Sequence, residues 1–264
     1  MSLKQWQQEA IKLKEQGYSG RAIARILGRS KSSVNSFFQG LEAQKEFVKR
    51  GEHKGPRVLF LDIETRFIVT QGWGLFNQNF SLEQIQEDWS ILSYSAKFLN
   101  SDEVIYSDVS NKTEDDLLEE LYHLFDTSDF VIGHNLDRFD LPKIRARMIA
   151  RGFPPHSPVR TIDTLKIAKQ EFKFTSNKLA YLTNLLCKAN KKSDHAKFAG
   201  FSLWKEFVRG NPEAVREMRE YNMADVTSLE ELYLILAPWS TKAPQFELYE
   251  EEIDMSAWEP CGYV

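Results

Sequence analysis

Residues 57 to 65 read RVLFLDIET, a continuous apolar run that ends in two carboxylates. Such a run predicts a strand buried on both faces, as in the centre of an α/β sheet. Asp62 and Glu64 are two residues apart, so a strand directs both carboxylates to one face at its C-terminal end. Ligands of open α/β sheets gather beyond such ends. Acidic residues that merely end a strand give the same pattern, so this segment alone does not define a site.

The segments that follow predict an α/β domain with a mixed five-stranded sheet flanked by helices. Their apolar spacing gives six further elements before a mostly helical stretch that runs to about residue 236. These elements are strands at 91–98 and 103–108 joined by a turn, a helix at 113–125, a strand at 129–135, a helix at 141–152 and a strand at 159–165. The order β, β, β, α, β, α, β followed by helices is typical of a mixed sheet with helices on its faces.

The first 50 residues predict a small all-α domain that is basic. Helical spacing at 3–16, a helix capped by Ser19, a turn at Gly28 and a helix after Ser30 give three short helices. Residues 1 to 55 hold 11 Lys and Arg against 5 Glu, a net charge of +6, whereas the remainder, with 23 against 33, carries −10. The basic part therefore fits phosphates, and the acidic part fits a carboxylate metal site.

This segment resembles a helix-turn-helix motif, with a small alanine in the first helix (Ala24), a glycine in the turn (Gly28) and an apolar anchor in the second helix (Val34). Residues 30–38 would then be the recognition helix. By that resemblance, Arg29, Lys31 and Asn35 contact nucleic acid. A protein-docking module with a solvated basic face is the alternative.

We expect the chain to be organised as a helix-turn-helix domain at 1–50, a linker at 51–56, a nuclease domain at 57–238 and an acidic tail at 239–264. The tail holds six acidic residues against one lysine. No apolar run approaches the roughly 20 residues of a membrane span, and the first residues lack a signal-peptide pattern, so we expect a cytoplasmic protein that needs no membrane. Two cysteines, Cys187 and Cys261, favour neither a disulfide framework nor a cysteine zinc site.

Two more segments carry candidate chemistry. GHNLDRFDLPKI (133–144) leads from a strand into a helix, and Asp140 precedes Pro142 in the first turn, although Asp137 competes for the same role. Tyr221 and Asp225 are four residues apart on a predicted helix and share one face. Each pattern also has a purely structural interpretation, because an acidic residue complements the helix dipole and a tyrosine packs.

Together, the DIET, HNxxxFD and YxxxD segments resemble the three motifs of the DEDD, or DnaQ-like, 3′ to 5′ exonuclease superfamily, whose fold is RNase H-like. The resemblance covers roughly residues 56 to 236. The proofreading domains of B-family DNA polymerases and some stand-alone exonucleases show a similar pattern. Some of these exonucleases are encoded by phages, and a phage origin would place this protein in the host cytoplasm. The other branch of the superfamily carries histidine five residues before the last aspartate, where this chain has Glu220. The tyrosine-bearing (DEDDy) subclass follows.

The resemblance implies a DNA exonuclease that uses two divalent metal ions, Mg²⁺ or Mn²⁺, which prefer oxygen ligands. By resemblance, Asp62 bridges both ions, Glu64 and Asp225 complete the ion on the nucleophile side, and Asp140 holds the second. Tyr221 positions the attacking water. A phenol with a pKa near 10 is a poor general base at neutral pH, so its role is orientation.

Other residues are candidates for contact with nucleic acid. Asn135 and Phe139 would touch the 3′ terminal nucleotide, and Lys178 would contact a phosphate. Core packing of Phe139 and a solvated helix face at Lys178 are the alternatives. Asp163 is a candidate outer partner of the metal site. The insert GWGLFNQNF (72–80) either stacks on unpaired bases or packs locally.

Several alternatives stay open at this point. The domain could be an inactive RNase H-like unit in a helix-turn-helix DNA-binding protein, or an RNA-directed or structure-specific nuclease. DNA is the expected partner, single-stranded at the 3′ end; duplex DNA at the basic module and RNA are alternatives that stay open. A replication, recombination or repair role would add a protein partner.

Overall fold

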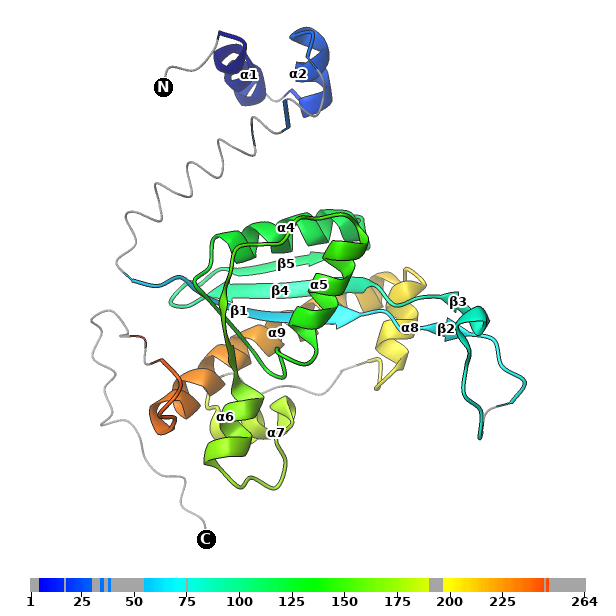
Figure 1. Ribbon diagram of the computed structural model, residues 1–264, viewed down its shortest axis with the longest axis vertical. Coiled ribbons are helices and arrows are strands. Elements are labelled where there is room, and N and C mark those ends of the chain that lie inside the picture. The colour runs from blue at the N-terminus through cyan, green and yellow to red at the C-terminus, as the bar shows by residue number, and fades with distance from the viewer. Residues whose placement is uncertain are drawn as a thin grey trace. The chain divides into compact units, whose positions relative to one another are not determined.

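The structure is a computed structural model that describes residues 5–16, 18–29, 34–35, 38, 55–74, 76–189, 197–244 and 246 (Figure 1). The chain divides into two compact units, Met1–Gly55 and Pro56–Val264. Among the helices that these residues form, none combines the length and the apolar character needed to cross a membrane.

The larger unit is built on one five-stranded sheet in the order β5-β4-β1-β6-β7. β1 (Val58–Thr65) lies in the centre, antiparallel to β4 (Ile91–Phe98) and parallel to β6 (Phe130–Gly133). β5 (Val104–Asp108) pairs antiparallel with β4, and β7 (Arg160–Asp163) pairs parallel with β6. The predicted mixed five-stranded sheet is confirmed.

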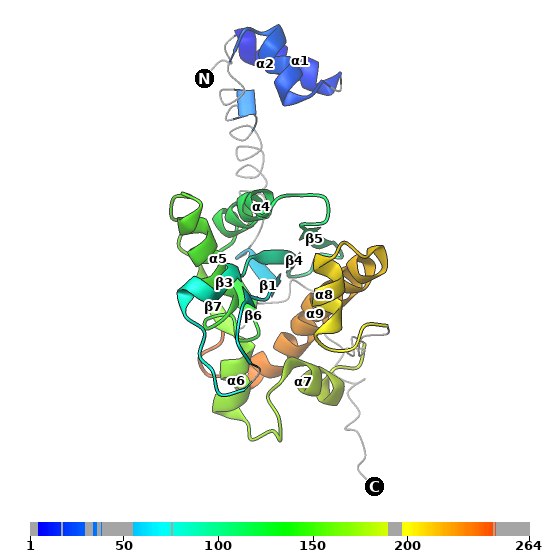
Figure 2. The same cartoon turned by 90° about the vertical axis from the view of Figure 1, so that its right-hand side faces the viewer.

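The side chains of β1 alternate between two hydrophobic cores, as the period of a strand requires. Leu59, Leu61 and Ile63 pack with α4 (Glu114–Asp126) and α5 (Asp140–Ala150). Val58 and Phe60 pack on the other face with three helices. These helices are α6 (Thr164–Glu171), α7 (Leu179–Leu186) and α9 (Pro212–Leu236). Figure 2 shows α5 and α9 on opposite sides of β1.

Local signals in the sequence set the helix starts. The Thr113 side chain accepts a hydrogen bond from the Asp116 N–H, and the Asp116 carboxylate accepts one from the Thr113 N–H, which begins α4. Asn211 caps α9 and Pro212 occupies its first turn. α9 is long enough to contact β1, β4 and α8 (Ser202–Val208), and it is followed by η2 (Ala237–Trp239).

Two parts of the larger unit differ from the prediction. The strand expected at 159–165 ends at Asp163, because the Asp163 carboxylate accepts a hydrogen bond from the Leu165 N–H and so starts α6. The stretch 66–90, for which no element was predicted, forms β2 (Val69–Thr70), η1 (Leu82–Gln84) and β3 (Ile85–Glu87).

The smaller unit contains α1 (Gln5–Glu15) and α2 (Gly20–Ile26), and the predicted Ser19 cap and Gly28 turn, with a φ of +61°, are confirmed. Val34 is buried with residues of both helices. The expected recognition helix at 30–38 lies mostly outside the described residues, as do Lys31, residues 51–54 of the linker and most of the acidic tail.

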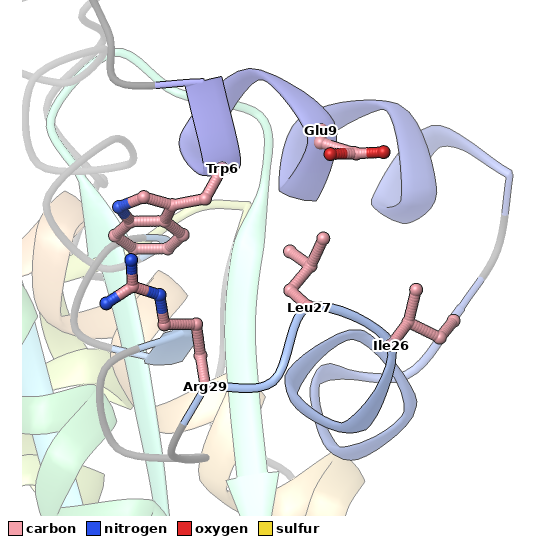
Figure 3. A pocket seen from close by; sticks show the side chains of 5 residues that line it. All are labelled: Trp6, Glu9, Ile26, Leu27 and Arg29. Carbon is pink, nitrogen blue, oxygen red and sulfur yellow. The ribbon is translucent and has the colours of Figure 1, made fainter.

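Two of the predicted nucleic-acid contacts in this unit are described. Asn35 is exposed, and the Arg29 guanidinium lies 5.1 Å from the centre of the Trp6 ring. Arg29 and Trp6 line a hollow of about 450 Å³ together with Glu9, Ile26 and Leu27 (Figure 3). The contact with Trp6 does not test whether Arg29 binds nucleic acid, so this role stays a prediction.

Candidate active site

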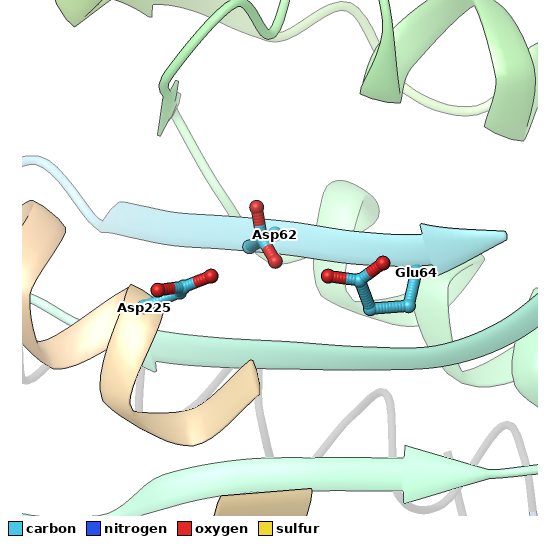
Figure 4. A group of neighbouring side chains, drawn as sticks. All are labelled: Asp62, Glu64 and Asp225. Atoms are coloured by element: carbon cyan, nitrogen blue, oxygen red, sulfur yellow. The ribbon is translucent and has the colours of Figure 1, made fainter. Parts of the chain in front are cut away.

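Three of the four predicted carboxylates meet on the α9 face of the sheet. Because Val58 and Phe60 face α9, the same alternation turns Asp62 and Glu64 toward it. α9 contributes Asp225, which is 3% exposed. One carboxylate oxygen from each of Asp62, Glu64 and Asp225 lies within 4.8 Å of the others (Figure 4).

This cluster suits a divalent cation. Carboxylates at such distances repel one another when ionised, and a cation relieves the repulsion. The three donors are hard oxygen atoms, the type that Mg²⁺ and Mn²⁺ prefer. The residues present therefore fit a metal ion of this class.

Asp62 is held by a buried amide that sequence reasoning missed. Asn222 Nδ2 donates to Asp62 Oδ2 at 2.6 Å, and Ser93 Oγ on β4 donates to Asn222 Oδ1 at 3.1 Å. Asn222 and Ser93 are both fully buried. This chain of hydrogen bonds holds the Asp62 carboxylate in place. Asn222 follows Tyr221 directly and stands three residues before Asp225, so helical spacing alone could have indicated it.

Glu64 is held from a different element. Trp204 Nε1 on α8 donates to Glu64 Oε2 at 2.9 Å. The Trp204 ring also meets the ring of Tyr221 edge to face, with centroids 6.0 Å apart. α8 is placed by packing of Leu203 and Phe207 against α9. No sequence signal links Trp204 to Glu64, because only tertiary packing brings α8 to the site.

Tyr221 lies at the cluster with its hydroxyl hydrogen-bonded to Asp225, one helical turn further along α9. Burial, with the negative charges of Asp225, Glu64 and Asp62, raises the pKa of Tyr221 far above its usual value. The phenol is therefore protonated at any physiological pH and acts as a hydrogen-bond donor. This agrees with an orienting role and argues against a general base.

Asp140 lies beside the cluster without joining it. It is the first residue of α5 and is 3% exposed. Its Oδ1 accepts a hydrogen bond of 3.1 Å from the N–H of Ile63, the residue between Asp62 and Glu64. Burial raises the pKa of Asp140, and the charge of Asp163 raises it further. Within the described residues, the three-carboxylate group does not include Asp140.

Asp163 organises the loop that leads to Asp140. Besides capping α6, it accepts hydrogen bonds from the N–H groups of Asn135, at 2.9 Å, and Asp137, at 3.4 Å. Asn135 has a φ of +69°, and the two hydrogen bonds hold this turn in place. Asp137, the competitor of Asp140, instead forms an ion pair of 2.6 Å with Lys166.

The predicted nucleotide contacts of the larger unit flank this loop. Asn135 and Lys178 line one hollow of about 500 Å³, together with Lys169. His134 is structural, since its ring nitrogens lie 2.9 Å from Thr164 Oγ1 and 2.9 Å from the Asn177 carbonyl. Phe139 is 38% exposed at the start of α5. The structure thus places Asn135 and Lys178 together, and their binding roles stay predictions.

Comparison with known proteins identifies the superfamily. The family model of the RNase H superfamily matches residues 59–237, more than half of the chain, so this chain belongs to that superfamily. No curated protein matches the sequence. A similar solved structure is the family B DNA polymerase from the hyperthermophilic archaeon Pyrobaculum calidifontis, with a TM-score of 0.52 and 15% identity. The match covers 69% of this chain and 25% of the polymerase, so this likeness concerns the fold.

Proposed function

We propose that the chain is a metal-dependent 3′ to 5′ exonuclease that hydrolyses phosphodiester bonds at single-stranded ends of DNA. The observation that carries the proposal is the cluster of Asp62, Glu64 and Asp225, with the hydroxyl of Tyr221 hydrogen-bonded to Asp225. The superfamily membership supports a nuclease. The direction, the DNA substrate and the DEDDy subclass rest on the motif resemblance and on the similarity to a polymerase fold.

The proposed mechanism assigns a role to each side chain. Two bound Mg²⁺ or Mn²⁺ ions would supply an activated water and stabilise the charge of the transition state. Asp62, Glu64, Asp225 and Asp140 would hold them. Tyr221 would orient the attacking water by a hydrogen bond from its hydroxyl, given up by Asp225, and its raised pKa keeps that proton in place.

Electrostatic catalysis requires donors that are already in place before reaction. Asn222 and Trp204 meet this requirement by fixing Asp62 and Glu64. Asp140 would give up its hydrogen bond from the Ile63 N–H in order to hold a metal ion.

The test follows 5′-labelled single-stranded DNA and RNA over time with Mg²⁺, Mn²⁺ or EDTA. We expect a metal-dependent ladder that shortens from the 3′ end, and no ladder for Asp62→Ala. Asp140→Asn and Asp137→Asn form a matched pair, since both remove one carboxylate from the same loop. Only the first should abolish cleavage, because Asp137 is paired with Lys166.

The same assay separates the alternatives. Faster cleavage of RNA than DNA would assign the activity to RNA, and cleavage restricted to duplex or branched DNA would indicate a structure-specific nuclease. Absence of cleavage by the wild type with either metal, together with retained duplex binding, would contradict the proposal in favour of a DNA-binding protein with an inactive domain.

A further inference from the structure

The insert that follows β1 presents aromatic side chains to solvent. We call residues 69–87 the aromatic hairpin, because β2 and β3 pair at its base. Trp73 is fully exposed and Phe76 is 85% exposed. Local packing, one of the two interpretations of this segment, therefore does not account for these rings. Exposed aromatic groups of this size mark binding surfaces.

The backbone that carries these rings is held in place. Gln71 N–H donates to the Gln84 carbonyl at 2.9 Å, and Gln84 Nε2 donates to the Gln71 carbonyl at 2.9 Å. A Cβ on Gly72 would lie 2.6 Å from the Phe80 ring, so only glycine lets Phe80 pack against this turn. Phe80 thus closes the loop. Trp73, the next residue after Gly72, stays outside it.

The aromatic hairpin follows the C-terminal end of the strand that carries Asp62 and Glu64. Trp73 follows Glu64 by nine residues, and nine residues reach at most about 30 Å. Two residues before the aromatic hairpin, the Phe67 ring packs against the Phe201 ring with centroids 4.9 Å apart. Phe201 precedes α8, whose Trp204 binds Glu64. Figure 1 shows β2 and β3 beyond the C-terminal end of β1.

The chemistry of this surface selects its partner. From Phe67 to Leu82 the sequence has no charged residue, so the surface offers nothing to phosphates. It offers aromatic faces and amide groups, which suit the faces and edges of bases. Bases in a duplex have their faces covered by their neighbours, and only unpaired bases can stack on Trp73 and Phe76.

We propose that the aromatic hairpin binds unpaired bases of the substrate strand by stacking on Trp73 and Phe76. The proposal rests on the proposed function and adds to it a basis for the choice of single strands. The cluster acts at the terminal phosphodiester, and the hairpin holds the strand some distance from it. Because every base has an aromatic face, the contact is independent of sequence.

The test measures binding of a labelled single-stranded DNA of about 15 nucleotides to the full chain in EDTA, where no metal-dependent cleavage occurs. Trp73→Ala and Phe76→Ala should each weaken binding by about 5- to 100-fold. Trp73→Phe should restore most of it, whereas Trp73→Leu should not, because leucine is apolar but cannot stack. Trp239→Ala, which removes another exposed tryptophan, should leave binding unchanged.

Substrate length provides a second readout with Mg²⁺. Cleavage of a dinucleotide should be insensitive to Trp73→Ala, while KM for the longer strand rises. Equal losses on both substrates would show a disturbed active site and overturn the proposal. Unchanged binding in Trp73→Ala, or full binding in Trp73→Leu, would also overturn it and indicate a hydrophobic protein partner. Because binding is measured without cleavage, an inactive wild type would refute the proposed function and leave this test intact.

Discussion

Removal of the Asn222 amide is the sharpest probe of the site. Asn222→Ala deletes the 2.6 Å hydrogen bond to Asp62 and leaves Ser93 Oγ without its acceptor, all in a fully buried position. A hydrogen bond to a charged group contributes roughly 1.5–3 kcal/mol. At 1.4 kcal/mol for each factor of ten, this equals about a 10- to 150-fold change, which matches the effect of losing an outer partner of a metal ligand. We therefore expect Mn²⁺ affinity to fall by about this factor.

Isothermal titration with Mn²⁺ measures the effect directly, and the Mg²⁺ concentration at half-maximal cleavage gives a second value. Ser93→Ala should have a smaller effect, because it loosens Asn222 without removing the bond to Asp62. Thermal unfolding in EDTA checks that each variant is folded. If Asn222→Ala binds Mn²⁺ within about twofold of wild type while Asp62→Ala does not bind it, the amide does not position Asp62 and the reasoning is wrong.

Three further predictions follow from the same contacts. Burial raises the pKa of Asp140, so the metal-free folded chain retains a proton on this carboxyl at pH values where the unfolded chain has lost it. The free energy of unfolding should therefore fall as the pH rises from the ordinary carboxyl pKa through the raised value. Thermal unfolding in EDTA should show this slope for wild type, and Asp140→Asn should abolish it; parallel curves would contradict the assignment. Tyr221→Phe should retain residual cleavage, lower by about 10- to 100-fold in kcat, while Asp62→Ala has none; near-wild-type rates for both would disprove the site. Replacing both Arg29 and Lys31 by alanine should weaken duplex DNA binding and reduce its salt slope by about 2, as gel-shift titrations at several salt concentrations would show; an unchanged slope would exclude the basic module from phosphate contact.

The sequence predicted the parts of the fold that local patterns control. The apolar run before Asp62 indicated the central strand, and its period of two placed Asp62 and Glu64 on one face, where the structure has them. Likewise, the four-residue spacing of Tyr221 and Asp225 predicted that both side chains lie on one face of a helix, as they do on α9. These predictions held because each depends on the geometry of a single element.

Features that depend on packing between elements could not be predicted from the sequence. Trp204 reaches Glu64 only because α8 packs on α9 through Leu203 and Phe207. The aromatic hairpin has short strands without the alternation of a half-buried sheet, so its pairing gave no pattern to find. The overestimated strand at 159–165 has another cause, because the cap at Asp163 overrides the strand pattern of the residues after it.

The position of Asp140 follows from the unequal lengths of two strands. β6 ends at Gly133, and its pairing with β1 stops at Phe60, so the N–H of Ile63 has no strand partner on that side. Asp140 supplies the acceptor, which satisfies a buried backbone donor that would otherwise cost free energy. The same gap in the ladder leaves Asp140 next to the backbone that carries Asp62 and Glu64.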